Sequence, residues 1–218
     1  MIPAEDYFYD TEFIEDSHRA PIDLISIGAK RGRDGAIYYA VSTEFDMYRA
    51  WFKKSPNGEY WLRDNVIKKL PLIMRTPTEV WLDGDGTPML DTSHPAVKSR
   101  HQIRADLTEF FELGIQLKRR LWAWYADYDH VVLSQLWGSM IQLPEGMPMF
   151  THDLKQVVDM AGNPAMPKQA EGAHNALHDA EHLYQMFVHC KNLGLLDKLP
   201  TALPMTVKPR PIRDNPQA

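Results

Sequence analysis

The chain has 218 residues, of which 44% are hydrophobic and 24% are charged, and its formal net charge is -5 at pH 7. A chain of this length can bury one substantial core, so a single folded domain is expected. The negative charge argues against binding duplex DNA by charge alone, although an enzyme that binds phosphates through metal ions can have an acidic site.

The cysteine and hydropathy patterns predict a cytoplasmic protein. The single cysteine, Cys190, cannot form an internal disulfide, which favours a reducing compartment. The sequence shows no basic leader followed by an apolar segment, and no run of about 18 apolar residues. We therefore expect neither a signal peptide nor contact with a membrane.

Three short runs rich in Ile, Tyr, Val and Phe come first and predict strands. They span Tyr7–Thr11, Leu24–Ala29 and Ile37–Ser42, and the turn-forming sequence Arg31–Gly35 separates the second from the third. Short strands divided by Gly and charged residues are typical of hairpins. We therefore expect a three-stranded antiparallel meander.

Two stretches downstream of the meander do not continue this pattern. Residues 51–71 are aromatic and basic with a predicted helix at Tyr60–Leu70, and residues 82–95 predict an excursion loop. We interpret both as insertions in the domain, with a role as lid, interface or decoration left open.

Helices alternate with one more strand in the second half. From Ser99 to Leu117 hydrophobic residues recur at helical spacing. Leu121–Tyr125 is an apolar aromatic run typical of a buried strand, and Asp129–Leu136 can form a short helix behind it. A helix followed by such a strand is the connection that a parallel sheet needs.

The last strongly periodic helix is predicted from Asn175 to a stop at Gly194. Hairpin strands followed by alternating helices and strands predict an α/β domain over residues 1–199, with a mixed sheet flanked by helices. Residues 200–218 are rich in Pro and lack a hydrophobic period, so they predict an extended tail.

The first strand ends in two acids, Asp10 and Glu12, which a strand would project from one side about 7 Å apart. Carboxylates at that separation repel each other unless a positive charge lies between them. An isolated pair of this kind is most often a solvated surface feature. Asp129, just after the apolar strand, and the pair His174 and Asp179, around the start of the last helix, supply a context that changes this interpretation.

These residues occur in the order D-x-E, Y-D-x-x-x-L and H-x-x-x-x-D. In this order the sequence resembles the DEDDh exonucleases of the ribonuclease H-like fold, and among them the polyadenylate-specific 3'-exoribonucleases, from about Tyr7 to Leu193. The resemblance implies a ribonuclease H-like sheet, with its first three strands antiparallel and the others parallel. Asp127 is a rival to Asp129, but the spacing to Leu133 favours Asp129.

The resemblance also implies the chemistry. Asp10, Glu12, Asp129 and Asp179 would hold two Mg²⁺ ions, with Mn²⁺ as a substitute, because hard cations prefer oxygen ligands. His174 would be the general base that takes a proton from the attacking water. The expected activity is the release of nucleoside 5'-monophosphates from the 3' end of single-stranded RNA, with adenylate-rich ends preferred, by a homodimer.

Two alternative functions stay open, a DNA exonuclease and a non-catalytic binding module. A DNA exonuclease of the same fold would degrade a DNA oligonucleotide faster than a matched RNA. A non-catalytic nucleic-acid-binding module would have no reason to retain four mutually repelling acids and a histidine.

Several residue roles stay open at this stage. Glu12 and Phe13 are expected to contact the substrate, but a core role is equally compatible with Phe13. His174, His178 and His182 have the spacing of a zinc-binding helix face, although such a helix would point Asp179 elsewhere.

Basic clusters are mostly expected to be solvated, with one or two following the RNA backbone. Lys68 and Lys69 form one such cluster. Arg100 and Arg104 were considered as contacts to phosphate or to a partner subunit.

Overall fold

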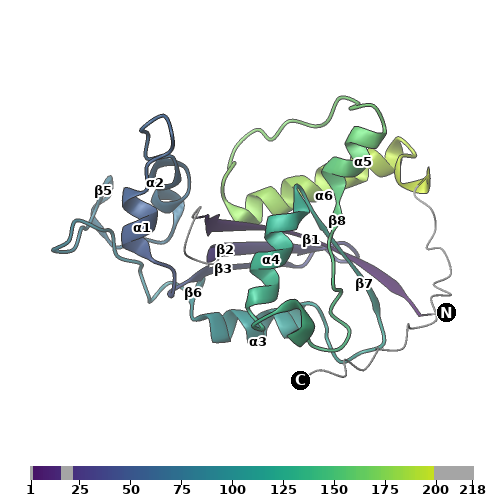
Figure 1. The fold of residues 1–218 in the computed structure, drawn as a ribbon, viewed down its shortest axis with the longest axis horizontal. Coiled ribbons are helices and arrows are strands. Elements are labelled where there is room, and N and C mark those ends of the chain that lie inside the picture. The colour runs from purple at the N-terminus through teal and green to yellow at the C-terminus, as the bar shows by residue number, and fades with distance from the viewer. Residues whose placement is uncertain (1, 16–21, 199–218) are drawn as a thin grey trace, which may run out of the picture.

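The structure, a computed structural model, describes residues 2–15 and 22–198. Its main feature is a six-stranded sheet with the order β6-β3-β2-β1-β7-β8 (Figure 1). The strands of this sheet are β1 (Ala4–Ile14), β2 (Asp23–Arg31), β3 (Ile37–Ser42), β6 (Val97–Lys98), β7 (Lys118–Ala123) and β8 (His152–Asp153). The helices are α1 (Met47–Phe52), α2 (Trp61–Asn65), α3 (Arg100–Phe110), α4 (Ala126–Gln135), α5 (Leu154–Met160) and α6 (Ala176–Asn192), with short 3-10 turns η1 (Ile67–Lys69), η2 (Met140–Gln142) and η3 (Leu196–Lys198).

The predicted meander and mixed sheet are confirmed. Strands β1, β2 and β3 pair antiparallel, whereas β7 runs parallel to β1 and β8 parallel to β7. On the other side the short β6 runs parallel to β3. The two-residue strands β6 and β8 were not predicted, because two residues carry no periodicity.

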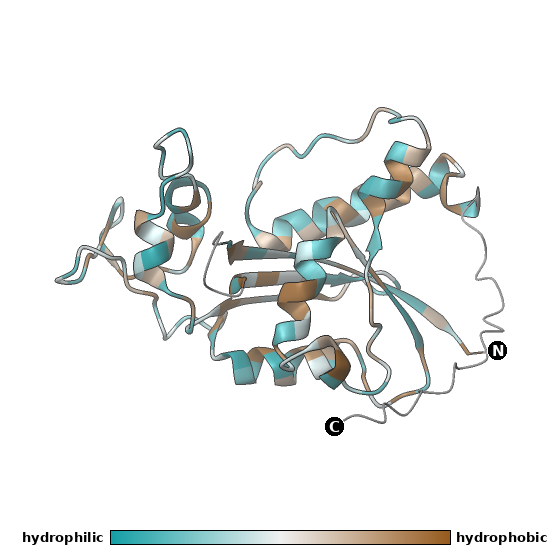
Figure 2. Cartoon of the chain, in the orientation of Figure 1, coloured by the Kyte–Doolittle hydropathy of each residue, from teal (hydrophilic) through white to brown (hydrophobic). Residues whose placement is uncertain are grey.

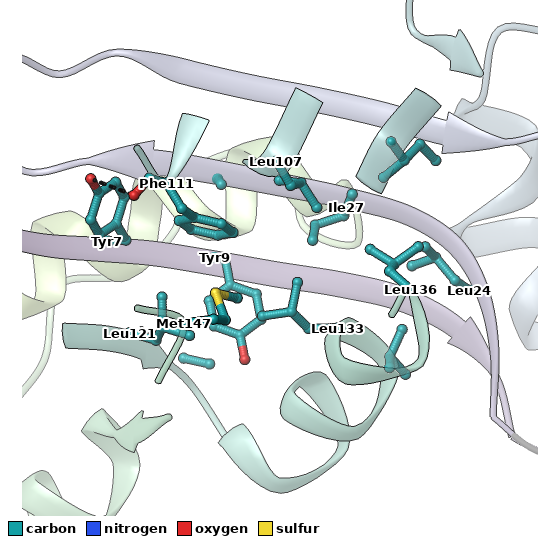
Figure 3. Close-up of a cluster of buried hydrophobic side chains, with 14 of the residues drawn as sticks. Tyr7, Tyr9, Leu24, Ile27, Leu107, Phe111, Leu121, Leu133, Leu136 and Met147 are labelled. Atoms are coloured by element: carbon teal, nitrogen blue, oxygen red, sulfur yellow. Dashed lines mark hydrogen bonds between the residues drawn. The ribbon is translucent and has the colours of Figure 1, made fainter. Parts of the chain in front are cut away.

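Side chains alternate along the central strand β1 and divide the core into two layers. Tyr7 and Tyr9 lie in the cluster formed with α3 and α4, where Leu107, Phe111 and Leu133 also pack (Figure 3). Phe8 lies on the opposite face, in the cluster formed with α5 and α6. This alternation places Asp10 and Glu12 on the face that α6 covers. The ribbon of each long helix shows both hydrophilic and hydrophobic stretches, as expected for helices with one buried side (Figure 2).

Helix α6 approaches the sheet unusually closely at its N-terminal end. A Cβ atom built on Gly28, in β2, would lie 2.2 Å from the backbone nitrogen of Leu177. Gly28 is the antiparallel partner of Asp10, so the absence of a side chain there brings the start of α6 over Asp10. Asn175 caps this helix by accepting backbone hydrogen bonds from Leu177 and His178, which confirms the predicted start.

The amphipathic helix predicted from Ser99 is α3, but its predicted extent is wrong at the end. Ser99 and Gln102 form a capping box at the start. The helix ends at Phe110, so Leu117 is not part of it. The backbone turns at Glu112, whose φ is 54°, and Gly114, whose φ is 100°, and both values lie outside the helical range.

The strand predicted at Leu121–Tyr125 is present, but its predicted start and end are both too late in the sequence. Strand β7 begins at Lys118 and ends at Ala123. Tyr125 has a left-handed φ of 60° and lies immediately before α4. Strand length was misjudged because the aromatic run continues into the turn. Trp122 is buried and Trp124 packs at the edge of the same cluster, as expected.

The segment of residues 47–70 packs at the end of the sheet. Its predicted helix at Tyr60–Leu70 is interrupted at Val66 into α2 and η1, and α1 was not predicted. The buried hydrophobic residues of this segment pack with Ile14 and Ile25 of the sheet; they are Ala50, Trp51, Leu62, Val66, Ile67 and Leu70. The segment therefore forms a small layer beside the carboxyl end of β1 (Figure 1).

The stretch at 82–95 is mainly loop, as predicted. The isolated bridge Leu72–Leu90 joins it to the preceding segment, and the bridge Leu82–Pro88 closes a turn within it. A small hairpin of β4 (Met74–Thr76) and β5 (Glu79–Val80) precedes it and was not expected. Residues 200–218 lie outside the described residues, so the extended tail and the domain boundaries stay predictions. Within the described residues, none of the helices has the length and apolar character that crossing a membrane requires.

Candidate active site

The end of β1 is open on one edge, and a helix takes up its free hydrogen-bonding groups. Strand β1 pairs with β7 only from Ala4 to Phe8 but continues to Ile14. Beyond that point Asp129, in the first turn of α4, accepts hydrogen bonds from the backbone N–H of Thr11 at 2.8 Å and from its hydroxyl at 2.6 Å. Both bonds end on Oδ1, so Thr11 fixes the position of this carboxylate beside the strand.

Asp129 rather than Asp127 is the acid directed inward. Asp129 is buried with 5% of its surface exposed, whereas Asp127 is exposed on the outer side of the same helical turn. The spacing argument from Leu133 therefore selected the carboxylate that reaches the sheet.

Burial and nearby charges shift the pKa of three of the four predicted acids, namely Asp10, Glu12 and Asp129. Burial raises the pKa of Asp10 well above its usual range, and the charges of Asp129, Glu12 and Asp179 raise it further. Burial also raises the pKa of Glu12 to about 8, with contributions from Asp179 and Asp129, while Lys69 opposes the shift. The pKa of Asp129 is raised by burial to about 7, although the hydrogen bonds from Thr11 lower it. The cluster thus resists carrying its full negative charge in the absence of a counter-cation.

Glu12, His174 and Asp179 form the group in the described residues that could hold a metal ion, with ligand atoms that all lie within 4.8 Å of one another. Asp179 is in the first turn of α6 and is held from two sides. Its Oδ2 accepts from the backbone N–H of His174 at 2.9 Å, and its Oδ1 accepts from the side-chain amide of Gln169 at 2.7 Å. Helix α6 and the loop before it are therefore joined at this carboxylate.

His174 lies in that loop, as predicted, and its backbone is strained. Its φ of 62° is in the left-handed region, which is uncommon for a residue other than glycine. Its imidazole meets the ring of Trp61 nearly at right angles, with 4.8 Å between the ring centroids. The preceding carbonyl, that of Ala173, accepts a hydrogen bond from Lys69 Nζ at 2.5 Å.

Phe13 packs against the core and also borders a cavity. Its ring stacks on Tyr128 with 5.8 Å between centroids and packs against the core. It also lines a cavity of about 650 Å³ together with Glu12 and Trp61. A second cavity, of about 610 Å³, lies beside Asp10 and His174. Asp10 and Asp179 thus border one cavity and Glu12 borders the other, and both cavities have a size typical of ligand sites.

Other predicted candidates are elsewhere. His178 is exposed and is not part of the metal-type group, which argues against a zinc face on the helix. Arg100 donates to Asp23 and to the hydroxyl of Ser42, away from the acids. Among the basic residues considered, Lys69 is the one whose charge reaches the acidic cluster.

Sequence reasoning missed three residues that shape the site, Thr11, Trp61 and Gln169, and it named Lys69 only as part of a basic cluster. Thr11 could have been suspected, since a hydroxyl between two acids points to the opposite side of the strand and can hold a third acid. Trp61, Lys69 and Gln169 are brought to the site by tertiary packing, and no motif in the sequence assigned them to it.

Known proteins of high similarity carry nuclease names. The chain is 43% identical over 181 residues to the 3'-5' exoribonuclease Rv2179c of Mycobacterium tuberculosis strain H37Rv, an alignment that covers 83% of this chain and 90% of that protein. The same values apply to the 3'-5' exoribonuclease MT2234.1 of strain CDC 1551.

Among solved structures, the crystal structure of cell-death related nuclease 4 (CRN-4) aligns at a TM-score of 0.42 and 12% identity. That alignment covers 88% of this chain and 65% of the other chain. The family model described as a 3'-5' exoribonuclease Rv2179c-like domain matches residues 5–190. The chain therefore belongs to the Rv2179c-like 3'-5' exoribonuclease domain family.

Proposed function

We propose that this protein is a metal-dependent 3'-to-5' exoribonuclease of the DEDDh type, which shortens single-stranded RNA and releases nucleoside 5'-monophosphates. The family supports the reaction and its direction. The observation that carries the metal dependence is the gathering of acids from separate elements. Glu12 of β1 and Asp179 of α6 lie with His174 in a group whose ligand atoms are all within 4.8 Å of one another, and the charges of Asp129, Glu12 and Asp179 act on the buried Asp10.

The donor set fits a hard divalent cation. Asp10, Glu12, Asp129 and Asp179 offer carboxylate oxygens, the ligands that Mg²⁺ and Mn²⁺ prefer. The main positive charge acting on them is that of Lys69, and it acts on Glu12. Such a cluster can be fully ionised at neutral pH only if cations bind to it. We assign these four residues as the holders of the metal, with two ions as the expected number.

When bound, the metal supplies the charge that activates water and stabilises the oxygens exchanged at phosphorus. The residues of the chain supply the other parts of the reaction. An imidazole nitrogen of His174 accepts the proton of the attacking water. Thr11 holds the carboxylate of Asp129 in place by a hydrogen bond, and Gln169 holds that of Asp179. Phe13 and Glu12, which line the same cavity, contact the substrate.

A preference for adenylate-rich ends, a homodimeric state and a cytoplasmic location rest on the sequence resemblance and composition alone. Degradation rates on adenylate, uridylate and cytidylate homopolymers of one length would test the first. Light scattering after size-exclusion chromatography would test the second, with a mass near that of one chain as the contradicting result.

The central experiment uses RNA labelled at its 5' end, incubated with and without Mg²⁺. We expect stepwise shortening, mononucleotides that carry a 5'-phosphate, and no reaction with a chelator. A DNA oligonucleotide of the same sequence, tested with Mn²⁺, is the control for substrate class. Faster loss of DNA than of RNA would contradict the proposed substrate.

A further inference from the structure

The strained backbone of His174 requires support from outside its own loop. A non-glycine residue with a left-handed φ is disfavoured by roughly 1–3 kcal/mol and persists where surrounding contacts determine it. His174 follows a stretch from Gly162 to Ala173 that has no helix or strand. From the side of α6, the hydrogen bond between its N–H and Asp179 is one such contact.

The opposite side of the loop is held by the segment of residues 47–70. Lys69 Nζ donates to the carbonyl of Ala173 at 2.5 Å, across 104 positions of sequence. The ring of Trp61 meets the imidazole of His174 at 77°. An edge-to-face contact of this kind restricts how the imidazole can rotate. One contact thus restrains the backbone just before His174, and the other restrains its side chain.

The two supporting side chains stand on a rigid base. Trp61 and Lys69 lie at the two ends of α2 and η1, and both are exposed to solvent. The residues between them that face the protein, Leu62, Val66 and Ile67, are buried against the end of the sheet. Trp61 and Lys69 would therefore stay in place if the loop moved, because the packed core beneath them resists small shifts.

We propose that Trp61 and Lys69 are positioning residues that hold His174 in place for proton transfer, so that the 47–70 segment completes the site although it contributes none of the predicted catalytic residues. This inference rests on the proposed function, in which His174 is the base.

The test compares Trp61→Ala and Lys69→Met with two matched controls. Trp81 is a similarly exposed tryptophan, 49% against 42% for Trp61, and Lys68 is an exposed lysine that pairs with Asp64 instead. On single-stranded RNA we expect each test variant to lower kcat about tenfold with little change in KM, because small misplacements of a catalytic group reduce the rate strongly. Trp81→Ala and Lys68→Met should leave kcat unchanged, and Trp61→Phe and Lys69→Arg should recover most of it.

A second arm asks whether the effect passes through His174. In a His174→Ala background, Trp61→Ala and Lys69→Met should cause no further loss, since residues that act through one group are not additive. Hydrogen exchange of peptides covering residues 170–175 should become severalfold faster in Lys69→Met while melting temperatures stay close to wild type. Full additivity in the His174→Ala background, or unchanged exchange, would overturn the positioning role. If His174→Ala itself kept wild-type kcat, the proposed base would be wrong instead.

Discussion

The acids of the candidate site and its histidine are held in different ways. Asp10 and Glu12 are part of a paired strand, and Asp129 and Asp179 lie in the first turns of two helices. His174 lies in a loop, with a left-handed backbone and neighbours from a segment more than a hundred positions earlier. The comparison teaches that the acidic cluster is a property of regular elements, whereas the base depends on long-range contacts.

Among substitutions in the acidic cluster, Asp10→Asn is expected to have the largest effect on activity. This change removes a carboxylate on which the charges of the other three acids act, while keeping its shape, so nucleotide release should fall by on the order of a thousandfold or more. Circular dichroism should show an unchanged fold, and the rise in melting temperature caused by Mn²⁺ should disappear. Release at the wild-type rate would contradict the assignment of Asp10.

His174→Ala should also lower activity, but its effect on stabilisation by metal should differ from that of Asp10→Asn. Loss of a general base typically reduces rates by about 10²–10⁴. Because the four acids remain, the thermal stabilisation by Mn²⁺ should persist. A melting experiment with increasing Mn²⁺, run beside Asp10→Asn, separates the two. Loss of metal stabilisation in both variants would mean that the histidine is needed for the metal as well.

Gly28→Ala should displace the start of α6 from the sheet without replacing any of the acids or His174. A methyl group there would lie 2.2–2.3 Å from backbone atoms of Ala176 and Leu177, so the start of α6 must move away from Asp10. We expect kcat to fall about a hundredfold and stability to fall by about 1–3 kcal/mol. Gly84→Ala, at a position with nothing within 4 Å, is the control and should behave as wild type. Equal activity of the two variants would show that the close approach is not required.

When a chelator removes metal ions, the free energy of unfolding should depend on pH through the ionisation of the acidic cluster. The pKa of Glu12 is about 8 and that of Asp129 about 7, above their ordinary values of 4.5 and 3.8, because of burial. The folded state therefore binds more protons than the unfolded state in this window. The free energy of unfolding should be highest near pH 4–5 and should fall by several kcal/mol as the pH rises to about 8.

Urea unfolding at pH 5 and pH 8 measures this slope. Glu12→Gln should reduce it, since the amide does not titrate, and Mg²⁺ should offset the loss at pH 8. A chelated protein that becomes more stable toward pH 8 would contradict the expectation.

The smallest expected effect concerns the hydrogen bonds from Thr11 that position Asp129. Thr11→Val removes the hydroxyl donor but keeps the backbone donor, so one of the two hydrogen bonds to Oδ1 remains. A hydrogen bond to a charged group contributes about 1.5–3 kcal/mol. With one donor left, we expect kcat to fall about tenfold or less, and Thr11→Ser to restore it. Steady-state kinetics on RNA checks this, and an unchanged rate would show that the backbone bond suffices.

Local patterns predicted a large part of the fold. The meander, α3 and α6 follow from short strand-like runs and from helical spacing, and the structure adds caps at Ser99 and Asn175, where the two helices were predicted to start. The failures occurred where a pattern carries too little information. Strands β6 and β8 have two residues each, and the aromatic run after β7 continues past the end of the strand into Tyr125.

The candidate site divides in the same way. Asp10, Glu12, Asp129, His174 and Asp179 could be named from the sequence because each follows a recognisable element and the set occurs in a family order. The supports of these residues could not. Gln169 and Lys69 are ordinary polar residues whose importance arises from the residue that they meet.

The sequence by itself determined which residues alternate, which helices have caps and which acids stand at element ends, because these depend on neighbours within a few positions. Only the tertiary structure decided that Gly28 admits α6 and that residues 47–70 reach the loop of His174. Such contacts join residues far apart in the chain, and their formation depends on how whole layers pack against one another.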